Sequence, residues 1–269
     1  MQGTRSLPEF ERMSLVMAVI LLAYASAQFI DTPTQIITID IAGLFLNLSI
    51  NLKTITTVMA AILAGAGIDW ILQDGRNTVA ERVEHWMVPA LTAWIISLPL
   101  SNLPLSRDWW FVFIGGGLLL SLVIIAEFVS WNTEHAFFNY ASISLLALSY
   151  TLFLMLGISM QALEIRLILM LPALFASAGL ISLRVQLLGV SRNWSFVSLV
   201  TIAFLTAQFG AALNYWPVSS LSFGVLLLGL LYALNGILGS ISNKASLRKS
   251  LIENSTIMAI FSIIALFLP

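Results

Sequence analysis

The chain has 269 residues, of which 59% are hydrophobic and only 9% are charged, and its mean hydropathy is +0.97. A net charge of −1 gives no field that draws the protein to nucleic acid, and the lack of cysteine excludes disulfides and thiolate metal sites. This composition excludes a soluble domain and indicates an integral membrane protein.

Apolar segments predict an all-α polytopic membrane protein with about nine transmembrane helices in one bundle domain, residues 1–269. Each segment has about 20 residues, the length that crosses the hydrocarbon core of a bilayer. The predicted spans are 13–30, 54–72, 86–103, 109–130, 138–158, 165–187, 195–214, 221–240 and 252–268. The first span ends in Ala25-Ser26-Ala27, which resembles a signal-peptidase site, and cleavage there would leave eight spans. We expect this segment to be retained as a helix.

The segment between the first two spans alternates apolar and polar residues, which is typical of a strand. Two such runs flank Ala42-Gly43, so the sequence predicts a β-hairpin over residues 36–51 on the outer surface. Its apolar face is a possible assembly surface, and its residues are Ile37, Ile39, Ile41, Leu46 and Leu48. The alternative interpretation is that the hairpin only caps the outer helix ends.

Lys and Arg residues fall on one side of the nine spans by nine to three. One side carries Arg5, Arg12, Arg76, Arg82, Arg184, Arg192, Lys244, Arg248 and Lys249, and the other carries Lys53, Arg107 and Arg166. Because cytoplasmic loops collect Lys and Arg, we expect a multi-pass protein of the cell membrane with a cytoplasmic N-terminus and an extracytoplasmic C-terminus.

Three ionisable residues lie inside predicted spans, all near the inner ends: Asp69, Glu127 and Arg184. Charges in hydrocarbon are costly, so such residues are functional candidates by default. If their helices adjoin, Arg184 could bridge the two carboxylates, which would form a proton- or cation-binding pair on an inner vestibule. The alternative is that each residue reaches the headgroups or makes a structural pair.

Cofactor chemistry finds no support in the sequence. His85 and His135 are both predicted in inner loops, and no cluster of His and carboxylates has ligand spacing, so we expect no metal site and no cofactor. The helix that follows His85 is expected to begin near Val79, because Thr78 and Glu81 have the spacing of a capping box. Pro172 lies inside the sixth span and is expected to kink it.

Three stretches carry a resemblance to a known family: IDIAGLFLNLSIN (39–51), AGAGIDWIL (64–72) and NYWPVSSLSFGVLLLGLLYAL (214–234). They resemble an uncharacterised bacterial family of multi-spanning membrane proteins, a domain of unknown function. The resemblance implies a bacterial cytoplasmic membrane, and it implies no activity and assigns no residue.

Three classes of function remain open. The first is a non-enzymatic subunit or scaffold that contacts the lipid bilayer and other membrane subunits, as the outer hairpin suggests. The second is a permease for a small apolar or lipid-like substrate, as the inner carboxylates and Pro172 suggest. The third is an intramembrane enzyme acting on lipid, with Asp31 and Asp40 or Asp69 and Glu127 as the carboxylates.

Overall fold

The structure is a computed structural model that describes residues 10–30, 33, 35–41, 44–72, 79–131, 137–188, 195–242 and 246–268. These residues form nine helices and two strands. In chain order they are α1 (Phe10–Phe29), β1 (Gln35–Ile41), β2 (Leu44–Ile50), α2 (Leu52–Ile71), α3 (Val79–Asn102), α4 (Arg107–Trp131), α5 (Phe138–Ala162), α6 (Leu167–Leu188), α7 (Phe196–Asn214), α8 (Ser220–Ser242) and α9 (Leu247–Phe267).

Each helix overlaps a predicted span, although α3 begins seven residues before the span predicted from residue 86. Eight of the helices in the described residues are long and apolar enough to cross a membrane. The protein is therefore a multi-pass membrane protein. The helix outside this set is α3, which contains Pro89 and Pro99 and begins at Val79, where the capping pattern placed its start. Pro172 lies inside α6, and the helix continues through it to Leu188.

Helix α3 is less apolar than its neighbours and packs against three of them. It contacts α1, α2 and α4, and it buries the polar side chains of Thr92 and Ser97 beside Ala93 and Ile96. At 24 residues α3 is about 36 Å long, which exceeds the hydrocarbon thickness of a bilayer. It still exposes Trp86 and Trp94, whereas its protein-facing side holds polar groups, so a hydropathy average underrates this helix.

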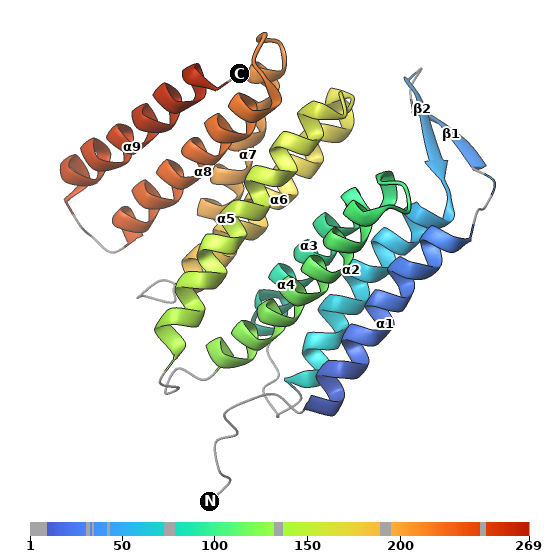
Figure 1. The fold of residues 1–269 in the computed structure, drawn as a ribbon. Helices are drawn as coiled ribbons and strands as arrows, with labels where there is room; N and C mark the ends of the chain where they lie inside the picture. The colour runs from blue at the N-terminus through green and yellow to red at the C-terminus, as the bar shows by residue number, and fades with distance from the viewer. Residues whose placement is uncertain are drawn as a thin grey trace, which may run out of the picture. The chain divides into compact units, whose positions relative to one another are not determined.

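The helices form two compact units, Met1–Leu145 and Leu146–Pro269. Unit 1 contains α1 to α4, the hairpin and the first residues of α5, and unit 2 contains the rest of α5 and α6 to α9 (Figure 1). Each unit has its own apolar core. Folding as a single domain stays a prediction, and each unit is described by itself below.

In unit 1 the helices run antiparallel, so each end of the unit gathers residues that are distant in sequence. At one end the Arg12 guanidinium donates to the Trp70 carbonyl oxygen at 3.3 Å, which joins the start of α1 to the end of α2. At the other end Lys53 Nζ donates to the Ser101 carbonyl oxygen at 2.8 Å, which joins the start of α2 to the end of α3. Helix α3 thus runs the full length of the unit. The core between these ends contains Ile20, Ala64, Ile68, Ala93, Leu120 and Ile124.

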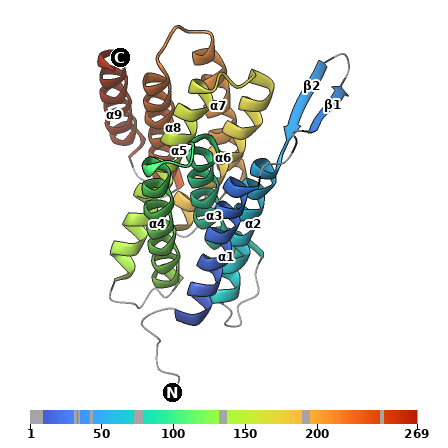
Figure 2. The ribbon, with the colours of Figure 1, turned by 45° about the vertical axis from the view of Figure 1, so that its right-hand side comes forward.

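Strands β1 and β2 form an antiparallel hairpin between α1 and α2, at the end of unit 1 where α1 stops (Figure 2). Its register pairs Ile37 with Leu48, Ile39 with Leu46 and Ile41 with Leu44. The two alternating patterns in the sequence are therefore in phase across the pair. The Asn51 side chain then caps α2 by accepting from the Thr54 amide at 2.8 Å.

Unit 2 packs its helices closely at glycines. A Cβ atom added to Gly157 of α5 would lie 3.4 Å from the Cα atom of Gly224 in α8, so these two backbones are nearly in contact. Small residues allow this approach, which is a common way for membrane helices to associate. The core of the unit includes Phe153, Leu174, Ile202, Phe223, Leu227 and Leu231.

The outward surface of the helices is apolar, as contact with lipid requires. On α4, exposed apolar residues repeat at helical spacing: Phe111 is 64% exposed, Leu118 63% and Leu122 63%. Their spacing places them on one face of the helix. Such a stripe would be unfavourable in water, so it marks a face that contacts the lipid bilayer.

Candidate functional site

A buried histidine and a buried glutamate form a hydrogen-bonded pair between α3 and α4 of unit 1. The distance from His85 Nδ1 to Glu127 Oε2 is 2.8 Å, His85 is 6% exposed and Glu127 is fully buried. Glu127 lies four residues before α4 ends, and His85 lies six residues after α3 begins, which places the pair one to two helical turns inside the bundle. Buried charges are normally compensated, so each group stabilises the other.

The placement of His85 corrects the prediction from the sequence. His85 was expected in a loop, but α3 already begins at Val79 and carries His85 into the bundle. The capping pattern at Thr78 and Glu81 contained this information, because a helix that starts there turns residue 85 inward about two turns later. Thr78, the side chain of Glu81 and His135 lie outside the described residues.

Neighbouring groups orient the carboxylate. Ser130, one turn further along α4, donates its hydroxyl to the backbone oxygen of Glu127 at 2.9 Å and lies 3.4 Å from Oε2. Because a carboxylate only accepts hydrogen bonds, the bond from His85 requires the proton on Nδ1. The second ring nitrogen, Nε2, is then the atom that takes up another proton. The pair therefore has the chemistry of a proton-binding site.

The other two residues singled out in the sequence lie elsewhere. Asp69 is half-buried near the end of α2, and the residue that hydrogen-bonds to Glu127 is His85, from α3. Arg184 lies in α6, in unit 2, and is fully buried. The bridge from Arg184 to the carboxylates stays a prediction, because the two units are described separately.

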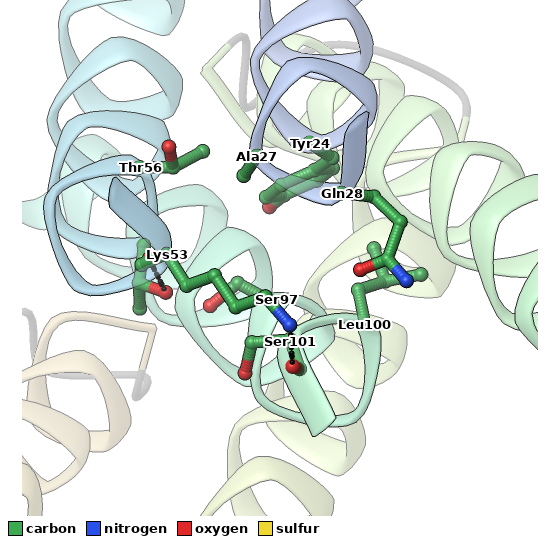
Figure 3. A pocket seen from close by; sticks show the side chains of 9 residues that line it. Tyr24, Ala27, Gln28, Lys53, Thr56, Ser97, Leu100 and Ser101 are labelled. Atoms are coloured by element: carbon green, nitrogen blue, oxygen red, sulfur yellow. Dashed lines mark hydrogen bonds between the residues drawn. The ribbon is translucent and has the colours of Figure 1, made fainter. Parts of the chain in front are cut away.

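A small pocket with several polar side chains in its lining lies at the opposite end of unit 1, where the hairpin joins the helices. Figure 3 shows side chains from α1, α2 and α3 around it, with the Lys53 ammonium group close to the end of α3. The pocket encloses about 240 Å³ when its open mouth is included. Its lining residues are Tyr24, Ala27, Gln28, Lys53, Thr56, Thr57, Ser97, Leu100 and Ser101.

Three side chains near this pocket satisfy backbone carbonyls at the end of α3. Lys53 donates to Ser101, Gln28 Nε2 donates to the Leu103 oxygen at 3.3 Å, and Trp109 Nε1 donates to the Leu100 oxygen at 3.2 Å. The last carbonyls of a helix have no partner within it, and a cation there also opposes the negative end of the helix dipole. The helix residues that flank the hairpin are thus hydrogen-bonded to the end of α3, through Gln28 before the hairpin and Lys53 after it.

Other candidate residues have no site built around them in the described part of the chain. Within it, no group of three or more His, Asp and Glu side chains is arranged to hold a metal ion. Asp31 lies outside the described residues, and Asp40 pairs with Phe45 in the hairpin.

Comparison with known families decides the identity of the chain. A family model for proteins of unknown function, DUF5656, matches residues 32–268. The chain belongs to this family. The match begins after α1, although α1 contributes Ile20 and Tyr24 to the core of unit 1. For this DUF5656 protein, comparison with the curated proteins and with the solved structures gives no match.

Proposed function

We propose that this DUF5656 protein is a proton-linked permease for a small apolar or lipid-like substrate in the cytoplasmic membrane of a bacterium. The observation that carries the proposal is the His85–Glu127 pair, a titratable pair enclosed by apolar helices and 2.8 Å apart. Ionisable residues that face the interior of a membrane bundle are rare and typically belong to ion pathways or proton relays.

The pair can carry out one step of such a cycle with its own atoms. With His85 neutral and Glu127 ionised, the pair carries one negative charge. A proton that arrives at Nε2 makes the pair electrically neutral overall, because the imidazolium and the carboxylate then balance each other. Since charge is costly in the bundle, a change in the charge of the pair changes which conformations are favourable, and this links proton binding to movement of a substrate.

The distribution of Lys and Arg supports an inward-facing location for the pair. Arg12 precedes the core of α1 at the same end of unit 1 as Trp70 and belongs to the side that carries nine of the twelve Lys and Arg residues. In the proposed topology this end and the N-terminus are cytoplasmic, and the C-terminus is extracytoplasmic. The pocket and the hairpin then lie on the outer side.

A direct test is infrared titration of the purified protein, which follows the ring vibrations of histidine as the imidazole takes up a proton. We expect a pH-dependent imidazolium band that is lost in His85→Gln and shifted in Glu127→Gln, because the carboxylate no longer accepts from Nδ1. The matched control is Glu253→Gln: this side chain is 60% exposed and lies 3.7 Å from Lys249 Nζ, so its removal should leave the band unchanged. A band that is the same in wild type and His85→Gln would contradict proton binding at the pair.

Transport is tested in proteoliposomes with a fluorescent short-chain phospholipid as the lipid-like probe and an imposed pH gradient. The proposal predicts probe movement that depends on the gradient, persists in Glu253→Gln and is lost in Glu127→Gln. Movement no faster than in protein-free vesicles, in a preparation whose imidazolium band is intact, would argue against a lipid permease while leaving the proton site in place.

A second candidate function is that of a subunit in a membrane assembly, and the hairpin favours it. The strand register aligns Ile37 with Leu48 and Ile39 with Leu46, so the apolar positions of both strands are in phase. A two-stranded hairpin is only marginally stable by itself in water, and its outer edges can pair with a further strand. Native mass spectrometry after mild solubilisation tests this role. A protein partner that is lost when Ile39 and Leu46 are both changed to Ser would support it, whereas a pure monomer would count against it.

A further inference from the structure

The pocket at the hairpin end of unit 1 combines a cation with hydroxyl oxygens, and this combination selects a class of ligand. Lys53 is half-buried there and donates to the Ser101 oxygen at 2.8 Å. An ammonium group has three N–H donors, so two remain after the single hydrogen bond that Lys53 makes within the described residues. These donors and the positive charge favour an anionic oxygen at the mouth of the pocket.

The hydroxyl groups of the lining have a different role, because their protons are already used. Tyr24 donates to the Ala93 oxygen at 2.6 Å, Ser97 to the Trp94 oxygen at 2.6 Å and Ser101 to the Leu98 oxygen at 2.9 Å. A hydroxyl has one proton but two lone pairs, so each of these oxygens remains an acceptor. The inner wall of the pocket therefore favours a ligand group that donates a hydrogen bond.

The size and position of the pocket further restrict the class of ligand that it can bind. Its interior holds about one water-sized group, which suits a hydroxyl, whereas a phosphate must stay at the mouth near Lys53. Phe29 (63% exposed) and Ile55 (46% exposed) lie next to the pocket residues Gln28 and Thr56 in sequence. Lys53 is in the first turn of α2, a helix that is long and apolar enough to span the membrane, and phospholipid phosphates lie at that depth.

We propose that this pocket binds the headgroup of an anionic phospholipid that carries hydroxyls, of the phosphatidylglycerol type. The phosphate oxygens accept from Lys53 and from the second N–H of Gln28, and a headgroup hydroxyl donates its one proton to the oxygen of Tyr24 or of Ser97. The first-turn amide of α2 has no part in this site, because Asn51 already accepts from the Thr54 amide. The site lies at the opposite end of unit 1 from the His85–Glu127 pair and stands independently of the proposed transport.

The test uses the full-length protein, stripped of lipid in detergent and incubated with equal amounts of phosphatidylglycerol and phosphatidylcholine. Native mass spectrometry then counts the retained lipids. We expect wild type to prefer phosphatidylglycerol and Lys53→Met to lose about fivefold in that preference, the factor that one cation contributes near anionic lipid. The matched control is Lys249→Met, since this side chain is 78% exposed and lies in unit 2, and it should retain the preference. Equal preference in wild type and Lys53→Met would overturn the proposal.

Lys53 also caps α3, so its removal can impair folding. Two further variants keep the hydrogen bond from Lys53 to the Ser101 oxygen. Gln28→Glu places a carboxylate where the phosphate oxygens would lie, and it should abolish the preference for anionic lipid while Lys53 remains bonded to Ser101. Ser97→Ala removes one acceptor from the inner wall. It should reduce the preference for phosphatidylglycerol over phosphatidylmethanol, an anionic lipid without headgroup hydroxyls, by about fivefold, the value of one hydrogen bond. Unchanged preferences in both variants would overturn the proposal.

Soluble phosphate esters provide the last arm of the test. Glycerol phosphate has the same phosphate and hydroxyl groups without acyl chains. We expect it to compete poorly at concentrations that match the lipid, because it lacks the apolar part that packs on the exposed helix faces. Competition by glycerol phosphate at equal concentration would assign the pocket to a soluble ligand and overturn the lipid assignment.

Discussion

Unit 1 and unit 2 bury different kinds of polar group. Unit 1 buries the His85–Glu127 pair, an imidazole hydrogen-bonded to a carboxyl group, whereas unit 2 buries the Arg184 guanidinium and the neutral pair of Asn235 and Ser182. The proposed proton chemistry therefore belongs to unit 1. In the same proposal the hydrogen bond between Asn235 and Ser182 in unit 2 serves packing.

The two units share one way of holding their helices together and differ in another. In both units helices approach closely at glycines, as at Gly116 beside Ile96 in unit 1 and at Gly157 beside Gly224 in unit 2. In unit 1, side chains from three helices also donate to carbonyls at the end of α3. Stability of unit 1 should accordingly respond strongly to loss of a polar partner.

The largest effect is expected from His85→Ala, which leaves the Glu127 carboxylate buried without its imidazole. Removing a hydrogen-bond donor from a buried charged group costs about 1.5–3 kcal/mol. The measurement is the free energy of unfolding in mixed micelles of a mild detergent and dodecyl sulfate. His85→Asn keeps an N–H donor for Glu127 Oε2 and should recover most of the loss. A His85→Asn variant as unstable as His85→Ala would show that packing of the imidazole, and not the hydrogen bond, stabilises unit 1.

The sequence predicted the helices well, because each long apolar run must satisfy its backbone within the bilayer. It did not predict the partner of Glu127. Lipid-facing and protein-facing sides of these helices are both apolar, so periodicity does not show which helix adjoins which. Hydropathy alone starts the third span at Trp86 and leaves His85 outside it, although the capping pattern predicts the helix start at Val79, where α3 begins. The capping pattern therefore predicts the start of α3 better than hydropathy does.

The pocket around Lys53 could not be predicted from the sequence either. In the sequence Lys53 is one of three outer charges, and nothing in its neighbourhood of the chain points to Ser101 or Gln28. These residues meet because α1, α2 and α3 run antiparallel and end at one level. In contrast, the strand register follows from the alternation itself, because each strand has one apolar and one more polar set of positions.

An intermediate effect is expected in unit 2 from Gly224→Ala. A Cβ atom at this position would lie 2.6 Å from Ile158 Cγ1 and 3.1 Å from the Leu154 backbone oxygen, so α5 and α8 must move apart. Overpacking of this kind costs about 1–3 kcal/mol. The matched control on the same helix is Gly239→Ala, where a Cβ atom meets nothing within 4 Å and the higher helix propensity of alanine should stabilise slightly. Equal unfolding free energies for the two variants would contradict close packing between α5 and α8.

The smallest effect is expected from Ser182→Ala, which removes the neutral hydrogen bond of unit 2. Asn235 Nδ2 lies 3.1 Å from Ser182 Oγ and also donates to the Leu231 oxygen at 2.9 Å, so the amide keeps one partner after the substitution. Hydrogen bonds between membrane helices contribute about 0.6 kcal/mol on average. A loss of that size in the unfolding free energy, beside a loss several times larger for His85→Ala, would support different roles for the two buried pairs. If Ser182→Ala cost as much as His85→Ala, charge would not distinguish the units, and a functional assignment to unit 1 would have to rest on proton binding alone.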